Sequence, residues 1–397
     1  MSYQKTKLAI IFLTIILLGS FGLAKSSKAA PSITGVSGEF TNGSQITVSG
    51  LGFGTKLQVG PLISSYDSAT AANNWLGGSV SPNWLVWNGM GLSATNSRAN
   101  TYQSSRKAIY DASGEYNAIG ISHHVPEDKI YISYWMYRDY PIWSGTVGSG
   151  NNQKWTRIYQ DTSHNNNSAS IMTSTMWGDD GNLSTAYFSP EHAPPCSGWT
   201  LAYVAPIYTT ARGCSGMWCI YLGNAVPSLR TWEHWEYYID YPTSIDGTDA
   251  AVTLWKDGAT VARSTGIALG EAGNGNTARD VLIGQVSGGQ TIPSPENLDQ
   301  IYIDNTPAHV FISDQTAYSW PDYGQLAHNE IQVPTIWSGN SLTFTLNQGS
   351  FSNGSQVYLY VVDSDGGINA NGYAITLGGS SESDTLSPQS PSGLSVQ

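Results

Sequence analysis

The sequence predicts an all-β fold, and three observations support this prediction. Glycine and proline are frequent, with 43 and 18 residues in a chain of 397, as expected for a fold with many turns. Charged residues make up only 12% of the chain, whereas 14 Trp and 23 Tyr supply wide aromatic surfaces. No stretch after residue 30 keeps a helical period, but several segments alternate in polarity with a period of two, as strands do. The length exceeds one ordinary domain, so we expect two.

The first 30 residues predict a signal peptide rather than part of the fold. Lys5 and Lys7 precede an apolar run at residues 8–18, and small residues around Ala24 and Ala29 offer cleavage sites. The apolar run is short for a membrane span. We therefore expect a secreted, extracellular or cell-surface protein with no membrane contact after cleavage, and an uncleaved anchor is the alternative.

The charge of the mature chain disfavours nucleic acid as a partner. The signal segment holds four of the 17 basic residues and none of the 29 acidic ones, which leaves 13 basic residues and a net charge of −16. Seven basic residues nevertheless fall between residues 98 and 157, so a polyanionic glycan is compatible with the chain.

The three cysteines are the disulfide candidates. An exported chain permits disulfides, and Cys196, Cys214 and Cys219 allow one bridge and leave one thiol over. The sequence leaves the pairing open.

Two distant segments each carry half of a small β-sandwich. Residues 31–56 contain two strand patterns around Asn42-Gly43 and then a cluster of glycines, and they resemble the start of an IPT/TIG immunoglobulin-like domain. Residues 331–377 resemble the end of the same family. The resemblance implies one split Ig-like domain, residues 31–63 plus 325–378, around an insert at residues 64–320; two separate small β-modules are the alternative. The Ser/Pro-rich residues 379–397 predict a disordered tail.

The insert contains a series of strand patterns. They cover residues 129–140, 155–160, 232–241, 251–256, 259–262, 281–284 and 298–305, with 309–312 as an edge strand. Alternation in residues 232–241 separates a polar face, with His234 and Glu236, from a face that carries Trp235. Asp257-Gly258 predicts a tight turn between two strands.

Residues 231–263 resemble the strand ladder of concanavalin A-like jelly-roll sandwiches, the superfamily of laminin-G domains, lectins, glucanases and polysaccharide lyases. The string Leu-Asp-Gln-Ile-Tyr-Ile-Asp-Asn at residues 298–305 resembles the closing strand of the same sandwiches. The resemblance implies a jelly roll beside the small Ig-like sandwich, and a protein that handles an extracellular polysaccharide.

Aromatic and polar side chains in the insert are the candidate substrate contacts, because flat rings match the apolar faces of sugars and polar groups fix their orientation. The predicted substrate-binding residues are Trp135, Tyr137, Trp143, Lys154, Trp177, Tyr187 and His192. Trp143 and Trp177 fall in segments rich in Gly and Asn, where we expect exposed rings.

A polysaccharide lyase needs a cation or amide to neutralise the uronate and a Tyr or His for proton transfer. The candidate catalytic residues are Tyr159, Arg157, Arg138, His124 and Gln160. Alternation predicts that Arg157 and Tyr159 share one face of their strand and that Lys154 and Gln160 share the other. The alginate-lyase sequence signatures are absent, so a non-catalytic lectin, an adhesin and a structural cell-surface protein remain alternatives.

The sequence gives less support for a glycosidase, a serine hydrolase or a metal site. Glu236 and Asp240 are the nearest pair of acids for a glycosidase, but the laminarinase-type signature is absent. No G-x-S-x-G elbow and no zinc spacing occurs. We expect no cofactor and assign no catalytic metal; the superfamily allows structural calcium, with residues 179–182 and the pair Asp299 and Asp304 as candidates.

Overall fold

The computed structural model describes residues 29–65, 84–87, 91–93, 98, 105–108, 117–138, 153–160, 170–177, 184–190, 220–221, 228, 230–245, 247–267, 269, 276–285, 296–319 and 326–379. Every regular element in these residues is a strand, which confirms the predicted all-β class. The described part contains no helix with the length and hydrophobicity needed to cross a bilayer. The predicted signal peptide and the C-terminal tail lie outside the described residues.

Seven strands form the sheet that we call the small sheet. Its order is β1 (Ser32–Gly38), β2 (Gln45–Leu51), β20 (Ser341–Thr345), β19 (Asn329–Trp337), β18 (His309–Ser313), β21 (Gln356–Val362) and β22 (Tyr373–Thr376). The first two strands of the chain thus share a sheet with the last five, and β2 pairs with β20 through Ile46 and Phe344. The split IPT/TIG domain and its boundaries stay a prediction.

One strand lies in a different sheet from the one predicted. The sequence predicted residues 309–312 as an edge strand of the insert, but β18 pairs with β19 on one side and β21 on the other. The edge-strand prediction is therefore wrong. All five β18 residues are buried, because the strand has the core of the small sheet on one face and the insert on the other.

The insert forms two sheets. The middle sheet has the order β15 (Ala259–Ile267), β14 (Ala250–Lys256), β13 (Trp232–Asp240), β8 (Lys129–Arg138), β17 (Glu296–Asp304), β6 (Ser105–Ala108) and β5 (Gly91–Ser93), with β3 (Ile63–Ser65) also paired to β17. The outer sheet has the order β12 (Ile220–Tyr221), β11 (Ser184–Pro190), β10 (Ser170–Trp177), β9 (Gln153–Tyr159), β16 (Ala278–Gln285), β7 (Asn117–Glu127) and β4 (Trp84–Trp87).

The middle and outer sheets enclose the largest apolar core. Trp235, Tyr237 and Ile239 of β13 enter this core with residues of β8, β9 and β16. The alternation predicted for residues 232–241 is thus confirmed, since His234 and Glu236 point to the other face of the middle sheet. Asp257 and Gly258 have φ values of 51° and 74° and make the tight turn between β14 and β15.

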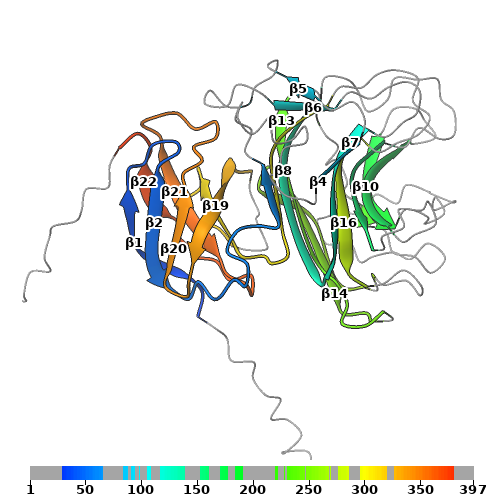
Figure 1. Ribbon diagram of the computed structural model, residues 1–397, viewed down its shortest axis with the longest axis horizontal. Helices are drawn as coiled ribbons and strands as arrows, with labels where there is room; N and C mark the ends of the chain where they lie inside the picture. The colour runs from blue at the N-terminus through cyan, green and yellow to red at the C-terminus, as the bar shows by residue number, and fades with distance from the viewer. Residues whose placement is uncertain are drawn as a thin grey trace, which may run out of the picture.

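The middle sheet is covered on both faces. Its second face packs against the small sheet, where Trp255 of β14 meets Phe311 and Tyr360. Figure 1 shows the resulting order of layers, with the small sheet, the middle sheet and the outer sheet side by side. In the described part of the chain, no further sheet lies over the outer sheet.

Candidate functional site

Strand β9 carries two predicted catalytic residues on the face of the outer sheet that points away from the core. Ile158 belongs to the core, so its neighbours Arg157 and Tyr159 point the opposite way. The Arg157 guanidinium carbon lies 4.4 Å from the centre of the Tyr159 ring, a cation–π contact that holds both groups in place. We call this side of the outer sheet around Arg157 the candidate face; the Arg157 and Tyr159 side chains are 1% and 2% exposed there.

A β-bulge changes the predicted position of Lys154. Thr156 pairs with Thr173 and Lys154 pairs with Ser174, so the ladder between β9 and β10 skips Trp155. Since Arg157 pairs with Met172, two residues before Ser174, Lys154 takes the same face as Arg157. Simple alternation had placed Lys154 on the opposite face, and that prediction is wrong because it assumed a regular strand.

Tyr187 joins the same rung of the outer sheet. It pairs with Ser174 from the β11 side, whereas Lys154 pairs with Ser174 from the β9 side. Two residues predicted as substrate contacts thus flank Ser174 of β10, which lies between β9 and β11. Arg157 pairs two residues earlier on β10, with Met172. The residue separation of 33 between Lys154 and Tyr187 gave no local signal for this convergence.

Two other candidates lie in or beside the outer sheet. The amide of Gln160 donates a hydrogen bond of 2.8 Å to the Leu269 carbonyl and is buried, so it ties the end of β9 to a neighbouring segment. His124 lies in β7, in the irregular stretch between the pair of Ser122 with Asp280 and the pair of Glu127 with Ala278. β7 is separated from β9 by one strand, β16.

Three candidates lie on the middle sheet instead. Arg138, at the end of β8, pairs with Glu296 of β17 and so belongs to a different layer from Arg157. Trp135 is 7% exposed and faces the small sheet, and Tyr137 contacts the ring of Trp232. The sequence grouped these residues with β9 because they are close in sequence, but the consecutive strands β8 and β9 lie in different sheets.

The remaining candidates are placed by their backbone or lie outside the described residues. Trp177, expected in a loop, is the last residue of β10 and pairs with Ser184. Outside the described residues lie Trp143, His192 and the disulfide candidates Cys196, Cys214 and Cys219.

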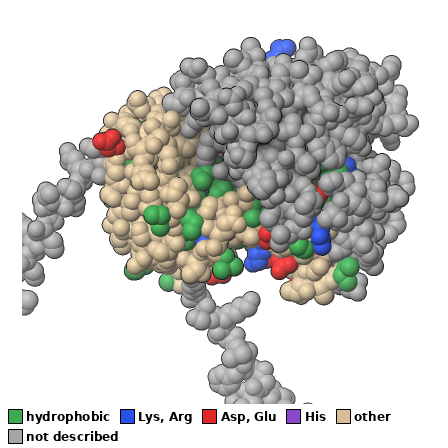
Figure 2. Space-filling model, in the orientation of Figure 1, with side chains coloured by type: hydrophobic (Ala, Val, Ile, Leu, Met, Phe, Trp, Pro, Cys, Tyr) green, Lys and Arg blue, Asp and Glu red, His purple; other side chains and the backbone are tan. Residues whose placement is uncertain are grey.

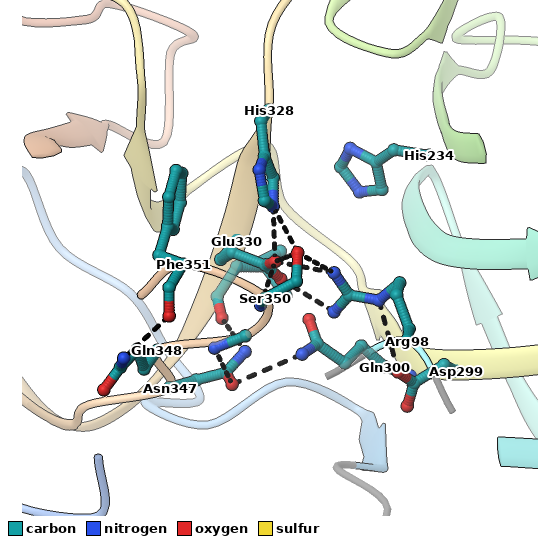
Figure 3. A network of polar contacts seen from close by, with 12 residues as sticks. Arg98, His234, Asp299, Gln300, His328, Glu330, Asn347, Gln348, Ser350 and Phe351 are labelled. Carbon is teal, nitrogen blue, oxygen red and sulfur yellow. Dashed lines mark hydrogen bonds and ion pairs between the residues drawn. The ribbon is translucent and has the colours of Figure 1, made fainter. Parts of the chain in front are cut away.

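A second polar cluster joins the insert to the small sheet (Figure 3). The Arg98 guanidinium donates to both carboxylate oxygens of Glu330, at 2.6 and 2.8 Å, and to Asp299 at 3.2 Å. It also stacks 4.1 Å from the Trp135 ring centre. His328 Nε2 lies 2.6 Å from Glu330, and the Ser350 N–H donates to the same carboxylate at 2.9 Å. Sequence reasoning missed this cluster, because Arg98 and Glu330 are 232 residues apart.

The electrostatics of this cluster are those of a buried structural ion pair. Burial by itself would raise the pKa of Glu330, but the charge and hydrogen bonds of Arg98, with the bond from His328, outweigh it and hold that pKa well below its usual range. Both Arg98 and Glu330 side chains are almost completely removed from solvent. Such a pair positions the two domains and offers no open surface to a substrate.

A group of three residues beside the ion pair has the order of a hydrolase triad: Ser133, His234 and Glu236. Ser133 Oγ is 2.8 Å from His234 Nε2, and His234 Nδ1 is 3.5 Å from Glu236 Oε2. All three are buried beneath the small sheet, where Tyr131 donates to Glu236 at 2.6 Å. Burial lowers the pKa of His234 to about 3 and, opposed by the Tyr131 bond, raises that of Glu236 to about 7. The group is part of the interface, because the small sheet excludes substrate from it.

The predicted calcium candidates Asp299 and Asp304 pair with cationic side chains. Asp299 accepts from Arg98, and Asp304 forms an ion pair with Lys56 in the segment between β2 and β3. The described residues hold no group of three or more His, Cys, Asp or Glu arranged for a metal. The other candidate, residues 179–182, lies outside the described residues.

Comparisons with known proteins give only distant structural neighbours for this chain. Neither a scan of protein-family models nor a search of curated proteins finds a match. Among solved structures, an endo-β-1,4-glucuronan lyase from the fungus Trichoderma reesei is 10% identical, with a TM-score of 0.39, over 62% of this chain and 95% of that chain. Alginate lyase Aly36B is 12% identical, with a TM-score of 0.36, over 69% and 98%. The botulinum neurotoxin serotype D ligand-binding domain, in complex with N-acetylneuraminic acid, is 9% identical, with a TM-score of 0.29, over 76% and 71%. At these identities and TM-scores, the likeness assigns neither a family nor an activity to this chain.

Proposed function

We propose that this chain is a secreted protein that binds an anionic extracellular polysaccharide on the candidate face and cleaves it by β-elimination. The observation that carries the proposal is the convergence of Lys154, Arg157 and Tyr187 on one face of the outer sheet, with Tyr159 stacked beside Arg157. The described part of the small domain shows few charged side chains in the view of Figure 2.

The residue types on the candidate face suit the elimination of a uronate polymer. A cation next to the uronate carboxylate stabilises the negative charge that develops when the C5 proton leaves, and Arg157 is suited to this role. A base removes the C5 proton and an acid protonates the departing O4, which leaves a C4–C5 double bond and consumes no water. Lys154 and Tyr187 pair with Ser174 from its two sides, at register positions on the same face of the outer sheet as Arg157. We assign proton transfer to this pair, with Tyr159 as the next candidate.

The test is turnover of a glycan panel by the purified chain. We expect uronate polymers to give a product with the ultraviolet absorbance of an unsaturated sugar, and neutral glycans to give none. Lys154→Ala and Tyr187→Phe should each lower the rate while polymer binding is retained. Lys129→Ala, on the partly exposed end of β8, and Tyr373→Phe, in β22, are the matched controls. Reducing ends without the unsaturated product would identify a hydrolase and contradict the elimination.

The second candidate function is glycan binding without cleavage, as in a lectin or adhesin. The cation–π contact between Arg157 and Tyr159 favours it, because side chains that hold each other in place suit a fixed binding surface. Retention of a uronate polymer without any product would support this function. Absence of both retention and product would rule out the candidate face as a glycan site.

A further inference from the structure

The apolar core of the insert contains one group of hydrogen-bonded polar side chains directly behind the candidate face. Tyr134 Oη lies 2.6 Å from Thr156 Oγ1, and the Trp155 indole N–H donates to Tyr237 Oη at 3.1 Å. The two tyrosine hydroxyls are 3.3 Å apart. All four side chains are completely buried. Tyrosine hydroxyls inside a core usually have a specific partner, and here two of the partners are successive residues of β9.

Those two residues form the β-bulge. In a regular strand Trp155 and Thr156 would point to opposite faces, but both make their bonds on the core side, to tyrosines of the middle sheet. A register without the bulge would withdraw one of them from its tyrosine and leave a buried hydroxyl or indole N–H without that partner, which is unfavourable in an apolar core. The tyrosines therefore select the bulged register of β9.

The bulge in turn decides which residues reach the candidate face. With it, Lys154 pairs with Ser174 and shares a face with Arg157; without it, strict alternation would turn Lys154 toward the core side. Bulges next to binding sites commonly redirect a side chain in this way. Lys154, Arg157 and Tyr187 can act on one ligand only while the bulge persists.

We propose that Tyr134 and Tyr237 are positioning residues of the candidate face, acting through the β9 bulge to hold Lys154 beside Arg157; as a statement about catalysis, this rests on the proposed function. Neither tyrosine reaches the candidate face, since both belong to the middle sheet and point into the core. Their hydroxyls, rather than their rings, carry the effect.

The test combines a structural readout with a kinetic one. Tyr134→Phe, Tyr237→Phe and the double variant keep the rings and remove the hydroxyls. Tyr241→Phe is the matched control, because Tyr241 lies in the same core and its hydroxyl has no hydrogen-bond partner among the described residues. Thr156→Val and Thr156→Ser, which remove and keep the β9 hydroxyl, form a second matched pair. Amine labelling of Lys154, read by mass spectrometry, reports the face that the lysine occupies.

We expect Lys154 labelling to change in the double variant and in Thr156→Val, and to stay unchanged in Tyr241→Phe and Thr156→Ser. The kcat on a uronate polymer should fall by up to about a hundredfold in the double variant with a smaller change in KM, because a catalytic group is displaced. If the double variant does not fold, the single variants and the Thr156 pair give the same comparison.

The outcomes separate this inference from the proposed function. Unchanged labelling in folded double and Thr156→Val variants, or an equal change in Tyr241→Phe, would overturn the positioning role. If the wild-type chain neither binds nor cleaves any uronate polymer, the proposed function fails, and the labelling alone still decides whether the tyrosines hold the bulge.

Discussion

At the residue scale, the interface between the insert and the small sheet places ionisable groups where water does not reach. Arg98 donates two hydrogen bonds to Glu330, which stays ionised. Among the described residues, Tyr131 is the hydrogen-bond donor to Glu236, and burial raises the pKa of that carboxyl to about 7. The difference follows from the partner, since an adjacent cation favours the charged form of a buried carboxylate. The two acids thus respond to pH in opposite directions.

Glu236 makes the protein less stable as pH rises. Its pKa is higher in the folded state, so the native protein binds the proton more tightly, and stability falls between about pH 4.5 and pH 7. We expect Glu236→Gln to leave stability nearly unchanged near pH 4.5 and to raise the free energy of unfolding at pH 8 by about 3 kcal/mol or less. Urea unfolding of both proteins at the two pH values measures this. His234 has the opposite sign, with stability lost as pH falls from 6.5 toward 3, and its effect cancels in the comparison. A variant that is less stable than wild type at pH 8 would contradict the assignment.

At the element scale, several strands depend on single residues that shape their ends or their register. Gln300, with a φ of 48°, lies where β17 shifts register against β8, and its side-chain amide donates to Asn347 in the small domain. Asp299, on the same bulge, accepts from Arg98. The insert thus turns two successive polar groups of one strand toward the small sheet.

The small sheet contains an internal repeat. The segments Phe-Thr-Asn-Gly-Ser-Gln, residues 40–45, and Phe-Ser-Asn-Gly-Ser-Gln, residues 351–356, precede β2 and β21. Gly43 donates to Leu346 and Gly354 donates to Leu377, each at 2.8 Å, and the strands that follow have equivalent registers with β20 and β22. The two segments differ at one position and make equivalent hydrogen bonds. This similarity indicates two copies of one turn-and-strand unit.

The segment just before the second copy of this turn carries a glycine, Gly349, that the interface requires. Gly349 has a φ of 57°, and an added Cβ would overlap the Glu330 carboxyl group. Gly354, with a φ of 84°, has open space around it and serves as the matched control for backbone strain. We expect Gly349→Ala to lower the melting temperature clearly more than Gly354→Ala, because it also disturbs the Glu330–Arg98 pair. Equal decreases in melting temperature for the two variants would mean that the strained backbone conformation accounts for the whole destabilisation. Thermal unfolding of the two variants in parallel decides this.

At the scale of the whole molecule, the insert and the small sheet share one buried interface. Trp255 and Tyr131 of the middle sheet pack against Phe311, Tyr360 and Ile331, and the Arg98 and Lys56 ion pairs flank these contacts. Separation of the small sheet from the insert would expose these aromatic rings to water and break the two ion pairs. The two domains therefore stabilise each other.

We expect the full chain to unfold in a single cooperative transition and residues 64–320 expressed alone to show none. The isolated insert would expose the aromatic face of the middle sheet and leave Arg98 without Glu330. Calorimetry of the two proteins measures this. A cooperative transition of the isolated insert near the temperature of the full chain would show instead that the small sheet is an independent addition.

Much of the fold, and less of the site, could be predicted from the sequence. Alternation in residues 232–241 and the Asp257-Gly258 turn are local properties, and both are confirmed. Placing Lys154 failed because a bulge depends on tyrosines of another sheet, about 20 and 80 residues away. Trp135 was expected to contact substrate, but its side chain is buried, which does not support that role. Alternation along a strand shows that the strand has two faces, but it does not show what covers each face.

The sequence by itself determined the all-β class, the position of most strands and the residues that share a face within a regular strand, because these follow from backbone geometry and the period of two. Only the tertiary structure decided that the small sheet covers the polar face of β13, that Arg98 pairs with Glu330, and that a bulge brings Lys154 to Arg157. These features depend on contacts between residues far apart in the chain, where burial and hydrogen-bond satisfaction outweigh local preference.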